Sequence, residues 1–182
     1  MIRSAILALT LSSAAAFSPE TTTRRQALSD FVAAAALVAV PSAATAIDAC
    51  PSGSNNCVRA KWSPPSGTSK ADAAKAIREA LNAYPQTGQD GGKVDGGGWA
   101  IVKVDLDGSG SATVEYKSAG TGFFAKAFNG GKPFVDDLKV EIEDSGIVQI
   151  RSASRIGDSD FGVNGKRVDA LAAGLKAKGW SV

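Results

Sequence analysis

Two segments of the chain carry apolar residues at the spacing of an amphipathic helix. The first begins at Ser69, a good N-cap with Asp72 three residues later, and it ends before Pro85. The second begins around Asn164 and stops before Gly179, which suits a C-cap. The apolar stripes consist of Ala73, Ile77, Ala80, Leu81 and Tyr84 in the first helix, and of Val168, Leu171, Ala172 and Leu175 in the second.

Four further segments alternate between apolar and polar residues, as half-buried strands do. Segments 99–106 and 111–117 predict one β-hairpin, and segments 134–143 and 148–156 predict another. In each strand, alternate residues are predicted to lie on one apolar face. These residues are Ala100, Val102, Val104 and Leu106 in the first strand, Ala112, Val114 and Tyr116 in the second, Leu138, Val140 and Ile142 in the third, and Val148, Ile150 and Ile156 in the fourth. The pattern therefore predicts an α+β fold, in which an antiparallel sheet of at least four strands has two helices packed on one face.

Two loops have alternative interpretations. In the first hairpin turn, Asp105, Asp107 and Ser109 match the spacing of a calcium loop, but Tyr116 stands where a bidentate Glu is required. A plain turn is favoured, because turns use the same residue types. Segment 118–133 contains three phenylalanines, and a buried lid over the sheet is favoured over an exposed docking patch. The three are Phe123, Phe124 and Phe128.

The first 46 residues have the pattern of targeting segments. Residues 1–16 combine an early Arg3, an apolar stretch and small residues, which predicts a signal peptide. Residues 17–46 resemble a plastid transit peptide that continues into a twin-arginine signal, with Arg24-Arg25, an apolar run and a second A-x-A site at residues 44–46. The sequence thus predicts a single mature α+β domain at 47–182 in the thylakoid lumen, with no membrane span. A permanent N-terminal anchor is the alternative.

Composition excludes several chemistries. The chain has no histidine, which removes Ser-His-Asp and Cys-His catalysis and histidine-ligated metals. A net charge of +2 over 182 residues gives no reason to expect nucleic acid. Two cysteines are too few for a Cys-rich metal site, so no cofactor is expected. In an oxidising lumen Cys50 and Cys57 are expected to pair as a static staple, with a redox-sensitive clip as the alternative. Residues 61–67 are expected to form an extended arm or linker.

Strand parity places one acidic residue on the core side. Asp136 shares the parity of Leu138, and the second hairpin brings it near Ser152 or Ser154. A carboxylate there must be hydrogen-bonded, because desolvation is costly. The opposite face carries a cross-strand ladder, interpreted as a solvated ion-paired surface or as an anion site. The ladder consists of Asp137, Lys139 and Glu141 against Gln149, Arg151 and Arg155.

Three motifs carry a family resemblance. They are CPSGSNNCV at 50–58, FVDD at 134–137 and RSASRIGDSDFGVNGKR at 151–167. Together they resemble the family catalogued as domain of unknown function 1499, in a plastid, thylakoid-lumen-targeted algal form. The resemblance implies no known catalytic residues. It implies a shared folding or binding role for a motif cluster consisting of Asp136, Asp137, Arg151, Ser152, Ser154, Arg155, Asp160, Asn164 and Arg167.

These observations favour a non-enzymatic accessory or binding protein associated with a thylakoid membrane protein complex. The second hypothesis is a small-anion or small-ligand binding protein that uses Arg151, Arg155 and Arg167. The third is a carboxylate-dependent hydrolase with Asp136 and Asp160 as acid and base.

Overall fold

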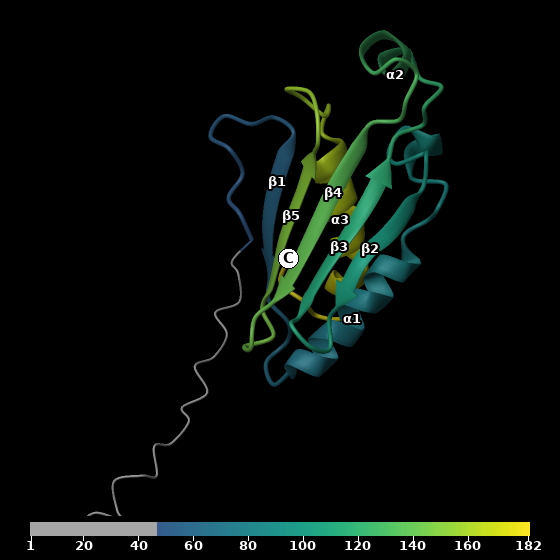
Figure 1. Ribbon diagram of the computed structural model, residues 1–182. Coiled ribbons are helices and arrows are strands. Elements are labelled where there is room, and N and C mark those ends of the chain that lie inside the picture. Colours follow the sequence, from purple (N-terminus) through teal and green to yellow (C-terminus); the bar gives the residue numbers. More distant parts are fainter. Residues whose placement is uncertain (1–46) are drawn as a thin grey trace, which may run out of the picture. The chain divides into compact units, whose positions relative to one another are not determined.

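A computed structural model describes residues 47–182 of the protein. The predicted signal peptide (1–16) and the predicted transit and twin-arginine segment (17–46) lie outside the described residues. In the described part, a five-stranded antiparallel sheet has the spatial order β1-β5-β4-β3-β2 (Figure 1). The strands are β1 (Cys57–Trp62), β2 (Trp99–Asp105), β3 (Ser111–Lys117), β4 (Val135–Ile142) and β5 (Val148–Ser154). The predicted α+β class with at least four strands is confirmed.

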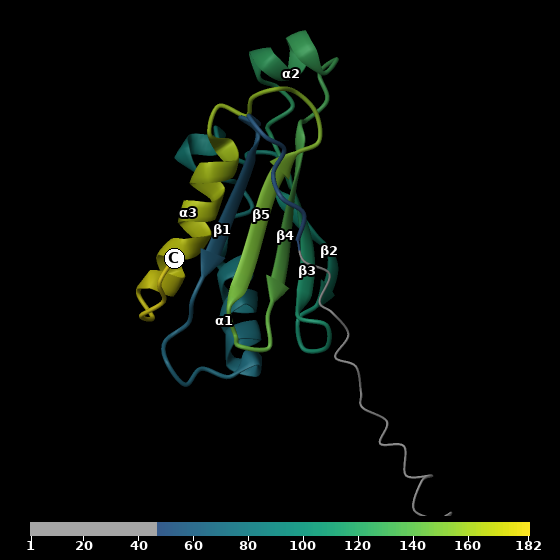
Figure 2. The ribbon, with the colours of Figure 1, turned by 90° about the vertical axis from the view of Figure 1, so that its left-hand side faces the viewer.

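Two long helices cover one face of this sheet. They are α1 (Lys70–Ala83) and α3 (Val163–Lys176), and both lie on the same side of the sheet in Figure 2. The Ser69 side chain accepts a hydrogen bond from the backbone N–H of Asp72 at 3.1 Å, which confirms the predicted N-cap of α1. A 3-10 turn, η1 (Asp90–Gly92), precedes β2, and a short helix, α2 (Phe123–Phe128), lies beyond one end of the sheet.

The core lies between the two helices and the inner face of the sheet. Both predicted helical stripes are buried there or pack against it. The inner-face residues predicted for β3, β4 and the start of β5 are also buried. These strand residues are Ala112, Val114, Tyr116, Leu138, Val140, Ile142, Val148 and Ile150.

Three predictions about strands are wrong. A β-bulge between Ile101 and Lys103 shifts the side-chain parity within β2, so Ala100, Val102, Val104 and Leu106 do not share one face. Val102 is 58% exposed, and Ile101 and Val104 pair with core residues of β3 instead. Ile156 is 47% exposed because β5 ends at Ser154, two residues earlier. Residues 61 and 62, predicted to begin an extended arm, end the edge strand β1, whose alternation of apolar and basic residues was missed.

The N-terminal arm is held by a disulfide and by the outer face of the sheet. Cys50 and Cys57 are joined, with an S–S distance of 2.05 Å, as predicted from the sequence. Before them, the backbone N–H of Ile47 donates to Glu141 at 3.0 Å, and Asp48 lies 3.6 Å from Lys139. No helix within residues 47–182 is long and apolar enough to cross a membrane.

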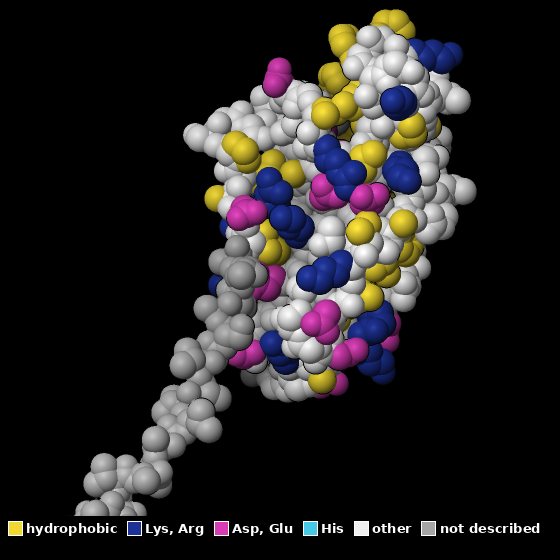
Figure 3. All heavy atoms as spheres, viewed as in Figure 1, with side chains coloured by type: hydrophobic (Ala, Val, Ile, Leu, Met, Phe, Trp, Pro, Cys, Tyr) yellow, Lys and Arg dark blue, Asp and Glu magenta, His cyan; other side chains and the backbone are white. Residues whose placement is uncertain are grey.

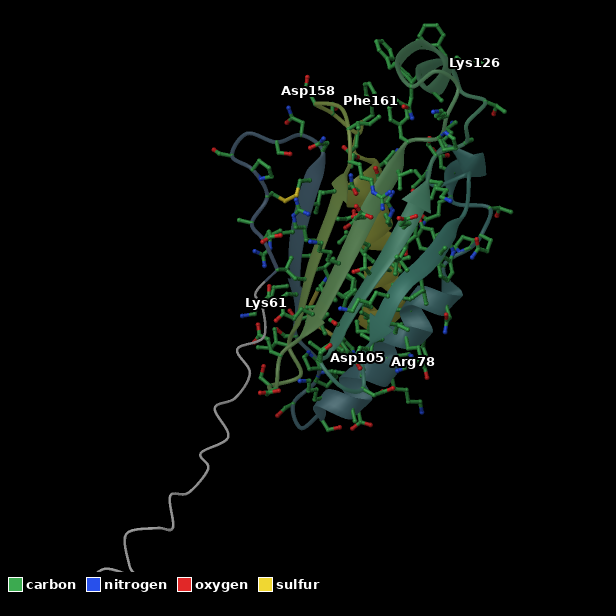
Figure 4. All side chains as sticks on the ribbon, viewed as in Figure 1. Lys61, Arg78, Asp105, Lys126, Asp158 and Phe161 are labelled. Carbon is green, nitrogen blue, oxygen red and sulfur yellow. A yellow bond between two sulfur atoms is a disulfide. The ribbon has the colours of Figure 1, made fainter. Side chains whose placement is uncertain are left out.

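The first hairpin turn folds around one carboxylate. The Asp105 side chain accepts a hydrogen bond from the backbone N–H of Ser109 at 2.9 Å, as in a capped turn. That bond, with a further one from the Ser109 hydroxyl, lowers the pKa of Asp105. Asp105 and Arg78 both lie at the end of the domain opposite α2 (Figure 4), and Arg78 is ion-paired with Asp107 of the same turn at 2.7 Å.

Candidate functional site

Arg167 is the centre of a buried polar cluster. Its side chain is 0% exposed. The guanidinium donates from Nε and Nη2 to Asp95, at 2.8 and 2.5 Å, and from Nη2 to Asp136 at 2.7 Å. Nη1 donates to Ser152 at 2.8 Å and to Asn164 at 2.6 Å. These bonds use all the N–H groups of an arginine side chain, so none is left for a ligand. We call these five residues the arginine cluster.

Separate elements bring the arginine cluster together. Arg167 and Asn164 lie three residues apart on α3, where side chains at that spacing share a face. Asp136 on β4 and Ser152 on β5 point to the core, as the strand parity predicts, and Asp136 is opposite Ser154 in the register. Asp95 comes from the glycine-rich loop before β2, where it adopts a left-handed φ of 56°.

The arginine cluster holds one guanidinium against two carboxylates. Burial lowers the pKa of Arg167, but Asp95 and Asp136 outweigh that effect, so the pKa of the guanidinium is raised and it stays charged. The Tyr84 hydroxyl donates to Asp95 at 2.6 Å, and burial together with this carboxylate raises the pKa of Tyr84. The Tyr116 ring lies 4.5 Å from the guanidinium carbon, a cation–π contact, and burial raises the pKa of this tyrosine as well.

The start of α3 is tied to both the cluster and the N-terminal motif. Asp160 accepts from the backbone N–H of Gly162 at 2.9 Å and from that of Asn164 at 2.6 Å, so it caps the helix. The Asn164 side chain amide donates to the backbone oxygen of Asn56, at 3.2 Å, and to Ser154, at 3.1 Å. The 50–58 motif and the 151–167 motif are therefore in direct contact.

The remaining predicted site residues lie on the outer face of the sheet. Arg155 donates from Nε and Nη2 to Asp137, at 2.9 and 2.7 Å, and from Nη2 to Glu115. Hydrogen bonds to these carboxylates raise the pKa of Arg155, and the group is surface-exposed. This triad is an ion-paired surface of the kind expected for the ladder.

Unlike Arg155, Arg151 has no acidic partner within residues 47–182. It is opposite Arg59 of β1 and Lys139 of β4 in the strand register, which places three cations in one row. Its Nε is buried and has no hydrogen-bond partner within residues 47–182.

The structure thus divides the predicted motif cluster in two. Asp136, Ser152 and Ser154 are gathered with Asn164 and Arg167 on the core side, and Asp160 lies beside them. The other three, Asp137, Arg151 and Arg155, are on the outer face. The three arginines of the small-anion hypothesis are therefore not brought to one place.

Sequence reasoning missed three members of the buried region. Asp95 lies in a loop with no periodicity, and the two tyrosines read as ordinary core residues. One signal was available: Arg167 shares the helical stripe with Leu171, which implied a buried cation. A buried guanidinium requires a carboxylate and acceptors for its remaining N–H groups.

An exposed aromatic patch is the second unusual feature. Phe123 is 75% exposed, Phe124 49%, Phe128 72% and Phe161 71%, so the prediction of a buried lid is wrong. The rings contact one another rather than the core: the ring centroid of Phe124 lies 5.6 Å from that of Phe123, 6.1 Å from Phe128 and 4.9 Å from Phe161. We call these four residues the phenylalanine patch. Apolar side chains gather at this end of the molecule, over α2 (Figure 3).

Phe161 has a strained backbone. Its φ of 55° is left-handed, a conformation that bulky residues rarely adopt. The Asp160 side chain, just before Phe161, accepts from the backbone N–H groups of Gly162 and Asn164, which follow it. These bonds, and a bond from the Phe161 N–H to the Ser159 hydroxyl at 3.3 Å, hold this conformation. Its ring lies at the same end of the molecule as Lys126 of α2 (Figure 4).

The fold and the buried site define a class: a disulfide-clipped α+β domain whose helix α3 is held to an antiparallel sheet through a fully enclosed arginine. The chain belongs to the family described as Protein of unknown function (DUF1499), which matches residues 46–175. No curated protein matches the chain. The family match covers the arginine cluster and the phenylalanine patch.

Proposed function

We propose that the protein is a non-enzymatic binding protein of the thylakoid lumen that docks onto a photosynthetic membrane protein complex through the phenylalanine patch. The exposure of four neighbouring phenylalanines carries this proposal. Exposed apolar patches of this kind mark interaction sites, and aromatic residues are enriched at the centres of protein interfaces.

The strained backbone at Phe161 supports a functional role for the phenylalanine patch. Left-handed backbone at a non-glycine residue costs about 1 kcal/mol or more and persists only where the surroundings enforce it. The ring is exposed, so burial in this chain does not offset that cost. The arginine cluster and the Asp160 cap fix the start of α3 and thereby present Phe161 beside Phe124.

Charge beside the patch suggests what the partner offers. Lys126, which lies within α2 between Phe124 and Phe128, and Lys132, four residues after α2, are both exposed. A partner surface with an apolar hollow and an acidic rim would complement this arrangement.

The carboxylates of the hydrolase hypothesis are already engaged. Asp136 is ion-paired with Arg167, and both Asp160 oxygens accept backbone N–H groups. This supports a binding role over acid–base catalysis. The lumenal location is supported by the two targeting patterns of residues 1–46 and by the disulfide.

Affinity purification of the tagged protein from thylakoids, followed by native gels, tests the proposal. The unchanged protein is expected to co-migrate with a membrane complex, and the double variant Phe123→Ser, Phe161→Ser is expected to run free. The matched control is Val102→Ser, Val104→Ser, which removes exposed apolar side chains from the β2 edge instead. Migration of the unchanged protein as free monomer would contradict the proposal.

A second candidate function is anion binding at Arg151, favoured by the buried Nε without a partner and by the adjacent Arg59 and Lys139. Titration with inorganic phosphate, monitored by thermal shift, tests this candidate. Arg151→Gln should abolish the shift, while Arg155→Gln, which removes an arginine already paired with acids, should retain it.

A further inference from the structure

Glu141 is a buried carboxylate with very little compensation. It lies on the outer face of β4 and is 8% exposed, and it contacts the arm residue Ile47, which is itself 9% exposed. Within residues 47–182, the one hydrogen bond that it accepts comes from the backbone N–H of Ile47, at 3.0 Å.

The neighbouring polar side chains are committed elsewhere. Lys139, two residues earlier on the same face, lies against Asp48. Gln149 is opposite Glu141 in the register, but its amide donates to Glu143 at 2.7 Å. A buried carboxylate normally requires a cation or several hydrogen bonds, and a single amide N–H supplies neither.

A chain terminus at Ile47 would supply a cation at this position. Ala44-Thr45-Ala46 forms an A-x-A cleavage pattern, and the next residue is Ile47. We propose that Ile47 is the first residue of the mature protein and that its α-ammonium group forms a buried ion pair with Glu141. The proposal concerns the maturation of the chain and does not depend on the phenylalanine patch.

The maturation step is a peptide-bond hydrolysis. A peptidase catalyses attack of one water on the Ala46 carbonyl carbon, the C–N bond to Ile47 breaks, and the water oxygen remains in the new Ala46 carboxylate. The two water protons end on the Ile47 nitrogen, which becomes an ammonium with three donors instead of an amide with one. The new positive charge then lies beside the Glu141 carboxylate, at the position of the present N–H.

This ion pair would fix the arm at its beginning. The Cys50–Cys57 disulfide already fixes its other end beside β1. Asn56, inside the disulfide loop, provides backbone contacts to Ser154 and Asn164. Removal of the presequence would therefore be coupled to ordering of the arm over the sheet and beside the start of α3.

The full chain with a controllable cut tests the inference. Residues 43–46 are replaced by Ile-Glu-Gly-Arg, so that a site-specific protease leaves Ile47 as the first residue. Urea unfolding before and after cleavage should show the unfolding equilibrium constant falling about tenfold. In Glu141→Gln, which keeps the shape and loses the charge, cleavage should change the constant by less than about twofold.

Two controls separate the ion pair from other effects of cleavage. Glu143→Gln removes the next carboxylate on the same face, and cleavage should still lower its unfolding equilibrium constant about tenfold. Placing the cleavage site three residues earlier leaves a short extension on Ile47, and cleavage there should leave the unfolding equilibrium constant unchanged. If cleavage lowered the unfolding equilibrium constant equally in Glu141→Gln and in the unchanged chain, the proposal would be overturned.

The chemistry of the new amine gives a second measurement. Acylation of the Ile47 amine by an N-hydroxysuccinimide ester, followed by mass spectrometry, should be about tenfold slower in the cleaved chain than in cleaved Glu141→Gln, because an ion-paired ammonium is protected. N-terminal sequencing of the native protein should begin at Ile47, and any other first residue would also overturn the proposal.

Discussion

At the scale of single residues, Arg167 is the side chain on which the buried site depends. It is completely buried, and each of its N–H groups has a partner. The planar fork of an arginine matches the two oxygens of Asp95, and a lysine cannot reproduce this bidentate pairing. Removing one partner of such a pair leaves an uncompensated buried charge.

Arg167→Lys is therefore expected to lower the free energy of unfolding by about 3 kcal/mol or more, because it breaks the fork to Asp95 and leaves hydrogen-bond acceptors unpaired. Urea unfolding followed by circular dichroism measures this change. Arg155→Lys is the matched control: its partners are on the exposed outer face, so a loss of at most about 1 kcal/mol is expected. Equal losses in the two variants would contradict a central role for Arg167.

The two buried tyrosines make the free energy of unfolding depend on pH in the alkaline range. Burial raises the pKa of both above the ordinary value near 10, so the folded state keeps protons that the unfolded state releases. The stabilisation is fully present below about pH 10, and it falls by about 1.4 kcal/mol per pH unit for each tyrosine above that pH.

In Tyr84→Phe, the free energy of unfolding should fall less steeply with pH above about pH 10. Urea midpoints measured from about pH 8 to about pH 11, a range that brackets the ordinary tyrosine pKa of about 10, would show this. At neutral pH the same variant should lose about 1 kcal/mol, because Asp95 loses a donor. Tyr116→Phe should be nearly neutral there, since its hydroxyl has no partner within residues 47–182. A profile in Tyr84→Phe as steep as that of the unchanged protein would contradict the assignment.

At the scale of elements, the segment from the end of β5 to α3 joins the buried site to the exposed patch. Asp160 caps α3, Asn164 binds both the cluster and the N-terminal motif, and Phe161 projects between them into solvent. The left-handed conformation of Phe161 is a cost to stability that a glycine would avoid. Stability and binding should therefore respond in opposite directions to a change at this residue.

Phe161→Gly is expected to stabilise the fold by up to about 1 kcal/mol, because glycine adopts a positive φ without strain. The same variant should weaken partner binding, because the patch loses one ring. Thermal unfolding and co-purification measure the two effects. Phe128→Gly is the contrasting variant: it removes a ring from within α2 and should lower stability. Lower stability in Phe161→Gly would show that the ring stabilises the fold.

At the scale of the whole molecule, residues far apart in sequence close the structure. The edge strand β1 pairs with β5, which places the disulfide arm beside the C-terminal motif. The other edge, β2, carries a bulge and Lys103, two features that discourage pairing with a further chain. The disulfide is the covalent link that holds the arm in this arrangement.

Cys50→Ser with Cys57→Ser is expected to lower the free energy of unfolding by about 2–2.5 kcal/mol, the chain-entropy value for a loop of this size. Chemical denaturation with and without a reductant measures the loss, which should match that of the reduced unchanged protein. An unchanged unfolding midpoint after reduction would show that the disulfide adds nothing to stability.

Most of the architecture followed from local pattern. The helices α1 and α3 and the strands β3 to β5 were predicted because a buried face imposes a period on the sequence. Parity alone predicted that Asp136 lies near Ser152 or Ser154, and the strand register places it opposite Ser154. The alternating segment of β1 was readable in the same way. The bulge in β2 was not, because one inserted residue reverses the parity without a local signal.

Tertiary structure determined the rest of the candidate site. Asp95 is 72 residues from Arg167 in sequence and lies in an aperiodic loop, so only the folded chain shows that they form a pair. Residue type predicted burial for Phe123, Phe124 and Phe128, yet α2 lies beyond the end of the sheet, where no core is available to cover them. Sequence alone thus determined which faces are apolar, because periodicity is local. Which charged groups meet, and which aromatic residues stay exposed, depends on distant segments packing together.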